Sequence, residues 1–125
     1  MSRDKGPTRP VIVVASVAAG PIEDAVLAGI EEEGVPFVVD RDVDRAEGAD
    51  AAALARVAAL RSPLGVGVGI DAAQGICVQP EKVADPMADL MSPPGAGAET
   101  ARVLGHDAAR ICVGLPLKGA GRRGT

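Results

Sequence analysis

Residues 64–70 read Leu-Gly-Val-Gly-Val-Gly-Ile, and this stretch decides the fold class. A period of two places the apolar side chains on one face of an extended strand and leaves the other face almost bare. Because glycine weakens a strand unless something approaches it closely, we predict a central strand whose bare face is covered by a packed helix. The segment lacks the GxxxxGKS or GxxxxGKT pattern and does not turn into a helix, which disfavours a phosphate-binding loop.

The segments before this strand alternate between strand and helix. Residues 11–15, Val-Ile-Val-Val-Ala, form a continuous apolar run that is typical of a strand buried on both faces. A helix is predicted over residues 21–33, with proline at its start and glycine just after its end. Residues 36–40 predict a second strand. A second helix is predicted from Asp50, its N-cap, to the Ser-Pro pair at 62–63.

The segments after the central strand complete the pattern. Residues 71–75 predict a turn and residues 76–79 a return strand. Residues 80–97, rich in proline, glycine and methionine, predict a long connection with little regular structure. The last helix is predicted over residues 99–113, after which residues 115–117 tuck back as a short extended segment. The order β-α-β-α-β-β-α predicts a single small α/β domain with a mostly parallel or mixed sheet.

The length of 125 residues suits one domain, which we place at residues 10–118. Residues 1–9 are predicted to be a flexible N-terminal tail, and residues 119–125 a basic, glycine-rich tail. The N-terminus lacks the apolar core of a signal peptide, and no apolar run approaches the roughly 20 residues that a membrane span needs. We therefore expect a cytoplasmic protein without membrane contacts.

The composition argues against nucleic-acid partners. The formal net charge is −4, whereas nonspecific binding to phosphates requires a basic surface. Phe37 is the only aromatic residue, so the chain has no stacking platform for bases. Cys77 and Cys112 match no metal-binding spacing and are each flanked by apolar residues, which predicts buried free thiols.

No catalytic group of residues is evident in the sequence. His106 is the only histidine, and its neighbour Asp107 cannot face it on a helix, so we predict a solvated or interface histidine. Four aspartates are interleaved with arginines around residues 40–50: Asp40, Asp42, Asp44 and Asp50. They do not match a calcium-binding loop and are predicted to be solvated.

Glu31-Glu32-Glu33 is the most unusual charged feature. Three successive carboxylates at the C-terminal end of a helix oppose the helix dipole and repel one another. Two interpretations remain open at this point: a solvated helix end, or an acceptor for a cation or for a partner's hydrogen-bond donors. One helix end cannot supply the full oxygen shell of a divalent ion, so the remaining ligands would come from elsewhere, such as another chain.

Three motifs resemble one known family. They are Leu-Ala-Gly-Ile-Glu-Glu-Glu-Gly-Val-Pro-Phe at 27–37, Arg-Ser-Pro-Leu-Gly-Val-Gly at 61–67, and Gly-His-Asp-Ala-Ala-Arg at 105–110, followed by Gly-Leu-Pro at 114–116. With the stretch 78–91 they span the chain from about residue 10 to residue 118. In order and spacing they are similar to the small (beta) subunit of the diol and glycerol dehydratase reactivating factors.

The resemblance implies a fold like the medium subunit of the adenosylcobalamin-dependent diol and glycerol dehydratases. It implies a non-catalytic protein without a cofactor of its own. Its partners would be the reactivase large subunit, an Hsp70-like ATPase that holds Mg and ATP or ADP, and the dehydratase large subunit. By exchanging with the dehydratase medium subunit it would release damaged cobalamin. The family also implies a heterotetramer with two copies of each subunit.

The resemblance assigns roles within the triple-glutamate string. Glu32, the middle residue, would reach the metal near the nucleotide site of the large subunit. Glu31 and Glu33 are interface candidates beside it. Two segments depart from familiar members of the family: the acidic loop at 41–50, and the tail at 119–125 with its two arginines.

Two alternatives stand beside this hypothesis. The first is the medium subunit of the dehydratase itself, although that subunit is usually longer at its N-terminus. The second is a free-standing α/β domain that binds a small molecule. The sequence leaves open whether a diol or a glycerol dehydratase is the client, and whether the complex associates with a bacterial microcompartment.

Overall fold

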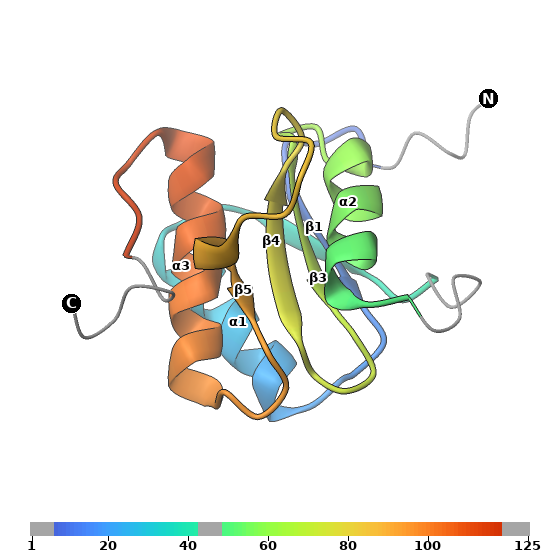
Figure 1. The fold of residues 1–125 in the computed structure, drawn as a ribbon. Coiled ribbons are helices and arrows are strands. Elements are labelled where there is room, and N and C mark those ends of the chain that lie inside the picture. Colours follow the sequence, from blue (N-terminus) through green and yellow to red (C-terminus); the bar gives the residue numbers. More distant parts are fainter. Residues whose placement is uncertain (1–6, 43–48, 119–125) are drawn as a thin grey trace.

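The computed structural model describes residues 7–42 and 49–118 and places a mixed sheet between two layers of helices (Figure 1). The elements in chain order are β1 (Ile12–Ser16), α1 (Pro21–Glu32), β2 (Phe37–Asp40), α2 (Ala51–Arg61), β3 (Val66–Ile70), β4 (Ile76–Pro80), the 3-10 helix η3 (Ala88–Leu90), β5 (Met91–Ser92) and α3 (Ala98–Val113). The predicted α/β class and mixed sheet are therefore confirmed.

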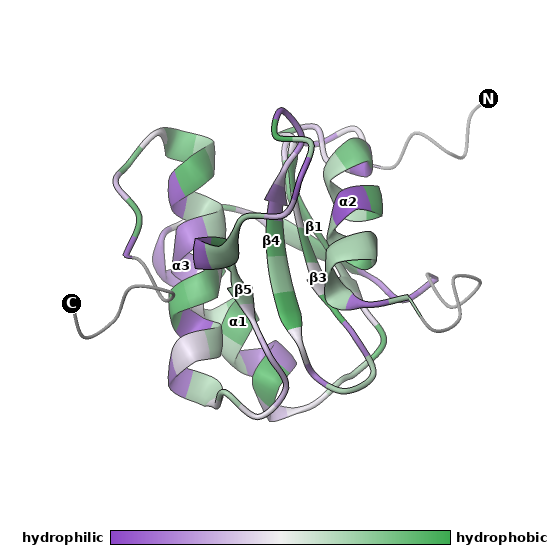
Figure 2. Cartoon of the chain, in the orientation of Figure 1, coloured by the Kyte–Doolittle hydropathy of each residue, from purple (hydrophilic) through white to green (hydrophobic). Residues whose placement is uncertain are grey.

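The sheet order is β2-β1-β3-β4-β5. Strand β1 is parallel to both β2 and β3, whereas β4 is antiparallel to β3 and β5 is antiparallel to β4. Helix α2 covers one face of the sheet, and α1 and α3 lie together on the other (Figure 1). Strands β3 and β4 are largely hydrophobic, whereas the helices mix hydrophobic and hydrophilic residues (Figure 2).

The bare face of β3 packs against α2, as the alternation predicts. Val66, Val68 and Ile70 belong to the core under α1 and α3, so the two glycines between them face α2. A Cβ atom at Gly69 would lie 2.1 Å from the Ala51 carbonyl oxygen, and one at Gly67 would lie 2.2 Å from the Ala59 amide nitrogen. Glycine is required at both positions because helix backbone occupies the space of a side chain.

Helices α1 and α3 also meet backbone to backbone. A Cβ atom at Gly29 would lie 2.1 Å from the Arg102 carbonyl oxygen. A Cβ atom at Gly105 would lie 2.1 Å from the Val26 carbonyl oxygen. This contact fixes how the C-terminal end of α1 lies against the middle of α3.

The structure corrects several predicted details. The stretch 80–97, expected to have little regular structure, contains the short helix η3 and the two-residue edge strand β5. Strand β3 begins at Val66, because Gly65 has a φ of 71° and cannot continue an extended strand. Cys77 is buried as predicted, whereas Cys112 in the last turn of α3 is half-buried. Burial raises the pKa of each thiol to about 11.

The C-terminal segment returns to the body of the domain, as predicted. Leu117 packs against the core under α3, and the Lys118 amide donates to the buried Asp107 carboxylate at 2.6 Å. Of the two predicted tails, residues 1–6 and 119–125 lie outside the described residues. Within the described part, no helix is long and apolar enough to cross a membrane.

We expect Gly69→Val to destabilise the domain by about 3 kcal/mol, because its side chain has to displace the first turns of α2. Ala53→Gln, on the exposed face of the same helix, should stay within about 0.5 kcal/mol of the parent. Urea unfolding followed by circular dichroism measures both. Equal stabilities of the two variants would contradict the close approach of α2 to β3.

Candidate functional site

Two carboxylates at the end of α1 face three basic side chains along α3. Glu32 is the last residue of α1 and Glu33 is its C-cap. Arg102, His106 and Arg110 are four residues apart on α3, so they lie on one face of that helix. We call these five residues the charge ladder.

Acidic and basic side chains alternate along the charge ladder. Glu32 Oε1 accepts hydrogen bonds from Arg102 Nε at 3.0 Å and contacts His106 Nε2 at 2.7 Å, while Glu32 Oε2 accepts from the Arg102 terminal nitrogen. Glu33 Oε2 contacts His106 Nδ1 at 2.7 Å and accepts from Arg110 Nε at 2.8 Å. Arg110 also donates to the Pro116 carbonyl oxygen at 3.1 Å, which ties the C-terminal segment to the ladder.

His106 occupies the centre of the ladder and is only 9% exposed. Of the two predicted alternatives, a solvated histidine is wrong, whereas an interface histidine stays a prediction. Each ring nitrogen faces a carboxylate oxygen, and an ionised carboxylate only accepts hydrogen bonds. Which ring nitrogen donates depends on the tautomer of the imidazole.

The ladder changes the interpretation of the triple-glutamate string. A solvated helix end does not describe Glu33, whose side chain is 13% exposed. Glu32 is paired with α3 as well, but its side chain remains 36% exposed. Glu31 is exposed and forms no ion pair within the described residues. The spacing of Arg102, His106 and Arg110 was visible in the sequence, but only the pairing of α1 with α3 places these residues opposite the glutamates.

The electrostatics of Glu33 follow from these contacts. The hydrogen bonds from His106, and after them those from Arg110, hold the pKa of the Glu33 carboxyl below its ordinary value of 4.5. Burial opposes this shift without reversing it. Ionised Glu33 is thus part of the folded ladder at neutral pH.

A second ion pair lies at the carboxyl end of β1. Glu23, in the first turn of α1, is only 4% exposed. Its two oxygens accept from Arg41 at 2.9 and 2.6 Å, and Ser16 Oγ donates to it at 2.6 Å. The Arg41 hydrogen bonds lower the pKa of Glu23, with Ser16 adding to the effect and burial opposing it.

The four aspartates predicted to be solvated differ in their exposure and their hydrogen bonds. Asp40 is half-buried and its carboxylate lies 3.5 Å from Arg61 Nε, so the prediction was wrong for this residue. Asp50 caps α2 by accepting from the Ala53 amide at 2.9 Å, as the N-cap prediction required. Asp42 is exposed, and Asp44 lies outside the described residues.

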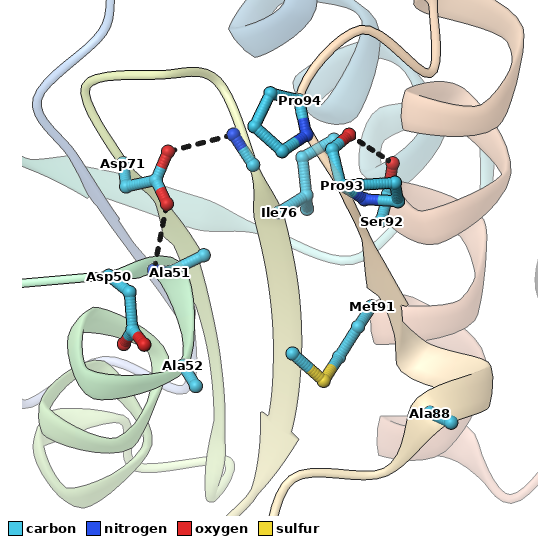
Figure 3. A pocket seen from close by; sticks show the side chains of 11 residues that line it. Asp50, Ala51, Ala52, Asp71, Ile76, Ala88, Met91, Ser92, Pro93 and Pro94 are labelled. Atoms are coloured by element: carbon cyan, nitrogen blue, oxygen red, sulfur yellow. Dashed lines mark hydrogen bonds between the residues drawn. The ribbon is translucent and has the colours of Figure 1, made fainter.

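A pocket of about 430 Å³ lies beside the start of α2 (Figure 3). Its lining residues are Asp50, Ala51, Ala52, Asp71, Gly75, Ile76, Ala88, Met91, Ser92, Pro93 and Pro94. Asp71 accepts hydrogen bonds from the amides of Ala51, Ala73 and Gly75 at 2.8 to 3.1 Å. Because Asp50 is the helix cap, both carboxylates of this pocket already hold the fold together.

No complete metal site is present within residues 7–42 and 49–118, where no three His, Cys, Asp or Glu side chains are placed to hold an ion. Glu32 still fits the role of a single shared ligand. Its side chain is 36% exposed, and a carboxylate is a hard oxygen donor of the kind that Mg²⁺ prefers. The other ligands of such an ion would have to come from a second chain.

The comparisons with known proteins define the family. The model of the dehydratase medium subunit family matches residues 7–118, and the chain belongs to this family. A solved glycerol dehydratase reactivase chain is 28% identical with a TM-score of 0.75, covering 90% of this chain and 99% of that one. A chain of a diol dehydratase-reactivating factor complexed with ADP and Mg²⁺ is 27% identical with a TM-score of 0.76, covering 89% and 99%. The search of curated proteins found no match.

The pKa of Glu33 gives a prediction for the pH dependence of stability. The pKa of Glu33 is lower in the folded chain than its ordinary value of 4.5. Its contribution to stability is therefore fully present above about pH 4.5, and it is lost as the pH falls through the pKa of the folded chain. We expect the urea midpoint to fall on acidification below about pH 4.5, and to fall less in Glu33→Gln. Glu31→Gln, at the exposed neighbouring position, serves as the control. An identical pH profile for Glu33→Gln and the parent would contradict the ladder.

Removing the partner of Glu23 should be costly because it leaves a buried carboxylate without its cation. We expect Arg41→Met to lower the thermal unfolding midpoint of the domain. The loss should be smaller than for a fully buried ion pair, because the Arg41 side chain is itself half-exposed. Arg56→Met removes the same charge from a residue that bonds only the Ala84 carbonyl oxygen in the described structure. Its expected cost is below about 0.5 kcal/mol, and thermal unfolding separates the two.

Proposed function

We propose that this chain is the small subunit of an ATP-dependent reactivating factor for an adenosylcobalamin-dependent diol or glycerol dehydratase. The observation that carries the proposal is the likeness to two reactivase chains at 27% and 28% identity. The alignments cover 99% of each of those chains and about nine-tenths of this one. The matched chains are therefore close to this one in length as well as in fold.

In this proposal the chain acts by binding and not by catalysis. It exchanges with the medium subunit of the dehydratase, whose fold it shares, and the exchange loosens the site so that damaged cobalamin leaves. The ATP hydrolysis, with its Mg²⁺, belongs to the partner large subunit, and the nucleotide state biases which partner the small subunit prefers. Engagement of the only histidine with Glu32 and Glu33 supports a non-catalytic role.

Glu32 is the residue that we propose to reach the partner's Mg²⁺. Its Oε2 accepts only from Arg102 in the described structure, and a carboxylate oxygen has a second lone pair to offer. Glu31, exposed beside it, would contact the partner directly. Glu33 is 13% exposed and held by two basic residues, so its proposed part in the interface is to hold His106 in place. The complex would act in the cytoplasm.

The medium subunit of the dehydratase is the second candidate, and the description of the matching family favours it. The two candidates share a fold and differ in their partner. A free-standing domain that binds a small molecule is the third, and the pocket beside α2 is the feature that favours it. The likeness to the two reactivase chains over 99% of their length is the reason that the reactivating factor is proposed first.

Co-purification distinguishes these functions. The chain is expressed with a reactivase large subunit and, separately, with a dehydratase large subunit, and complexes are isolated with Mg²⁺ and either ADP or ATP. Binding to both partners, with the preference switched by nucleotide, supports the reactivating factor. Stable binding to the dehydratase alone, unaffected by nucleotide, supports the medium subunit. A monomer that binds neither supports the free-standing domain.

We expect Glu32→Gln to weaken binding to the reactivase large subunit about tenfold in the presence of Mg-ADP, because a neutral amide is a poor ligand for a divalent cation. The loss should shrink when Mg²⁺ is removed with a chelator. Asp24→Asn, at an exposed position in the first turn of α1, is the charge-matched control. Unchanged affinity of Glu32→Gln with and without Mg-ADP would rule out a metal-linked role for this residue.

A further inference from the structure

The sequence motifs at 27–37 and 105–116 are joined in the structure by one side chain, Arg110. Its Nε donates to the Glu33 carboxylate at 2.8 Å, and its Nη1 donates to the Pro116 carbonyl oxygen at 3.1 Å. Glu33 is the C-cap of α1, Arg110 lies in the last turn of α3, and Pro116 follows α3 in the chain. One guanidinium therefore connects three separate parts of the domain.

The chain turns back after α3 and runs beside that helix (Figure 1). Gly114, with a φ of 75°, makes the reversal possible. The Leu115 amide closes the turn by donating to the Arg110 carbonyl oxygen at 3.0 Å. We call residues 114–118 the C-terminal strap.

The C-terminal strap is held mainly by single contacts along its length. Leu117 packs against the core, and every other strap residue is exposed. The Lys118 amide donates to the buried Asp107 carboxylate at 2.6 Å, and Pro116 accepts from Arg110. A short exposed segment with few buried contacts opens at a low free-energy cost while the rest of a domain stays folded.

Glu33 orders the arginine that the strap uses. Holding a free arginine side chain in one rotamer costs conformational entropy. The Arg110 and Glu33 side chains are only 25% and 13% exposed, so their ion pair is largely shielded from water. With Nε fixed by Glu33, the hydrogen bond to Pro116 requires little further ordering. Without Glu33, the same hydrogen bond would also have to order the whole Arg110 side chain.

We propose that the C-terminal strap opens and closes on α3, and that Arg110 couples its closure to the Glu33 contact at the end of α1. An interaction that draws Glu33 away from Arg110 loosens the strap, and opening uncovers the apolar surface under Leu117. The coupling is reciprocal, so opening the strap also loosens the hold of Arg110 on Glu33. The mechanism lies within this chain and does not depend on the identity of the partner.

Amide hydrogen exchange of Lys118 in the ¹⁵N-labelled full chain measures the opening of the strap, because this amide bonds Asp107 only in the closed form. We expect Glu33→Gln to accelerate the exchange about fivefold at neutral pH, which corresponds to the weakening of one hydrogen bond. Arg110→Met should give a similar acceleration. Adding Glu33→Gln to Arg110→Met should give no further gain, because the connecting side chain is already missing.

Two control variants separate this coupling from other effects. Arg41→Met removes a different ion pair and lowers the stability of the whole domain, so it should leave Lys118 exchange at the parent rate. Glu31→Gln removes a charge at an exposed position near Glu33 and should also leave the rate unchanged. Glu33→Ala gives the same readout if Glu33→Gln folds poorly.

Three results would each overturn the proposal. Lys118 exchange at the parent rate in Glu33→Gln means that the strap does not respond to the end of α1. A further gain on adding Glu33→Gln to Arg110→Met means that Glu33 acts by a route other than Arg110. An equal gain in Arg41→Met means that the strap opens only when the whole domain unfolds.

Discussion

The backbone contact between α1 and α3 at Gly29 and Gly105 is the constraint on which the rest of the candidate site depends. With hydrogen atoms as the only side chains at the crossing, the two helices approach until a Cβ atom would meet a carbonyl oxygen of the other helix. At that distance the end of α1 lies against the middle of α3, within reach of its basic side chains. A larger residue at either glycine would separate Glu32 and Glu33 from their partners.

Glycines also allow a close backbone approach on the other face of the sheet, where Gly67 and Gly69 contact the backbone of α2. The two close approaches compensate for a core with almost no large side chains, since Phe37 is the only aromatic residue. A core of valine, leucine, isoleucine and alanine reaches normal packing density only if its layers lie close together. The glycines therefore serve packing on both faces, and on one face they also position charges.

Several charged side chains of the described residues form ion pairs with one another. Glu23 is buried against Arg41, and Glu33 is held between His106 and Arg110. The Glu32 carboxylate is more exposed than those of Glu23 and Glu33, and its partner Arg102 is also exposed to solvent. The Glu32 carboxylate thus has one contact with a buried side chain, His106, and one with an exposed side chain, Arg102.

The sequence by itself determined the layers of this protein. The alternation at 64–70, the apolar run at 11–15 and the glycine and proline positions specified the strands, the helices and the helix that covers β3, because these depend on local periodicity and backbone geometry. It did not reveal η3 and β5, since a two-residue strand has no period. Only the tertiary structure decided the charge ladder and the Glu23–Arg41 pair. Their members are 18 to 77 positions apart, and no local pattern states which helix faces which.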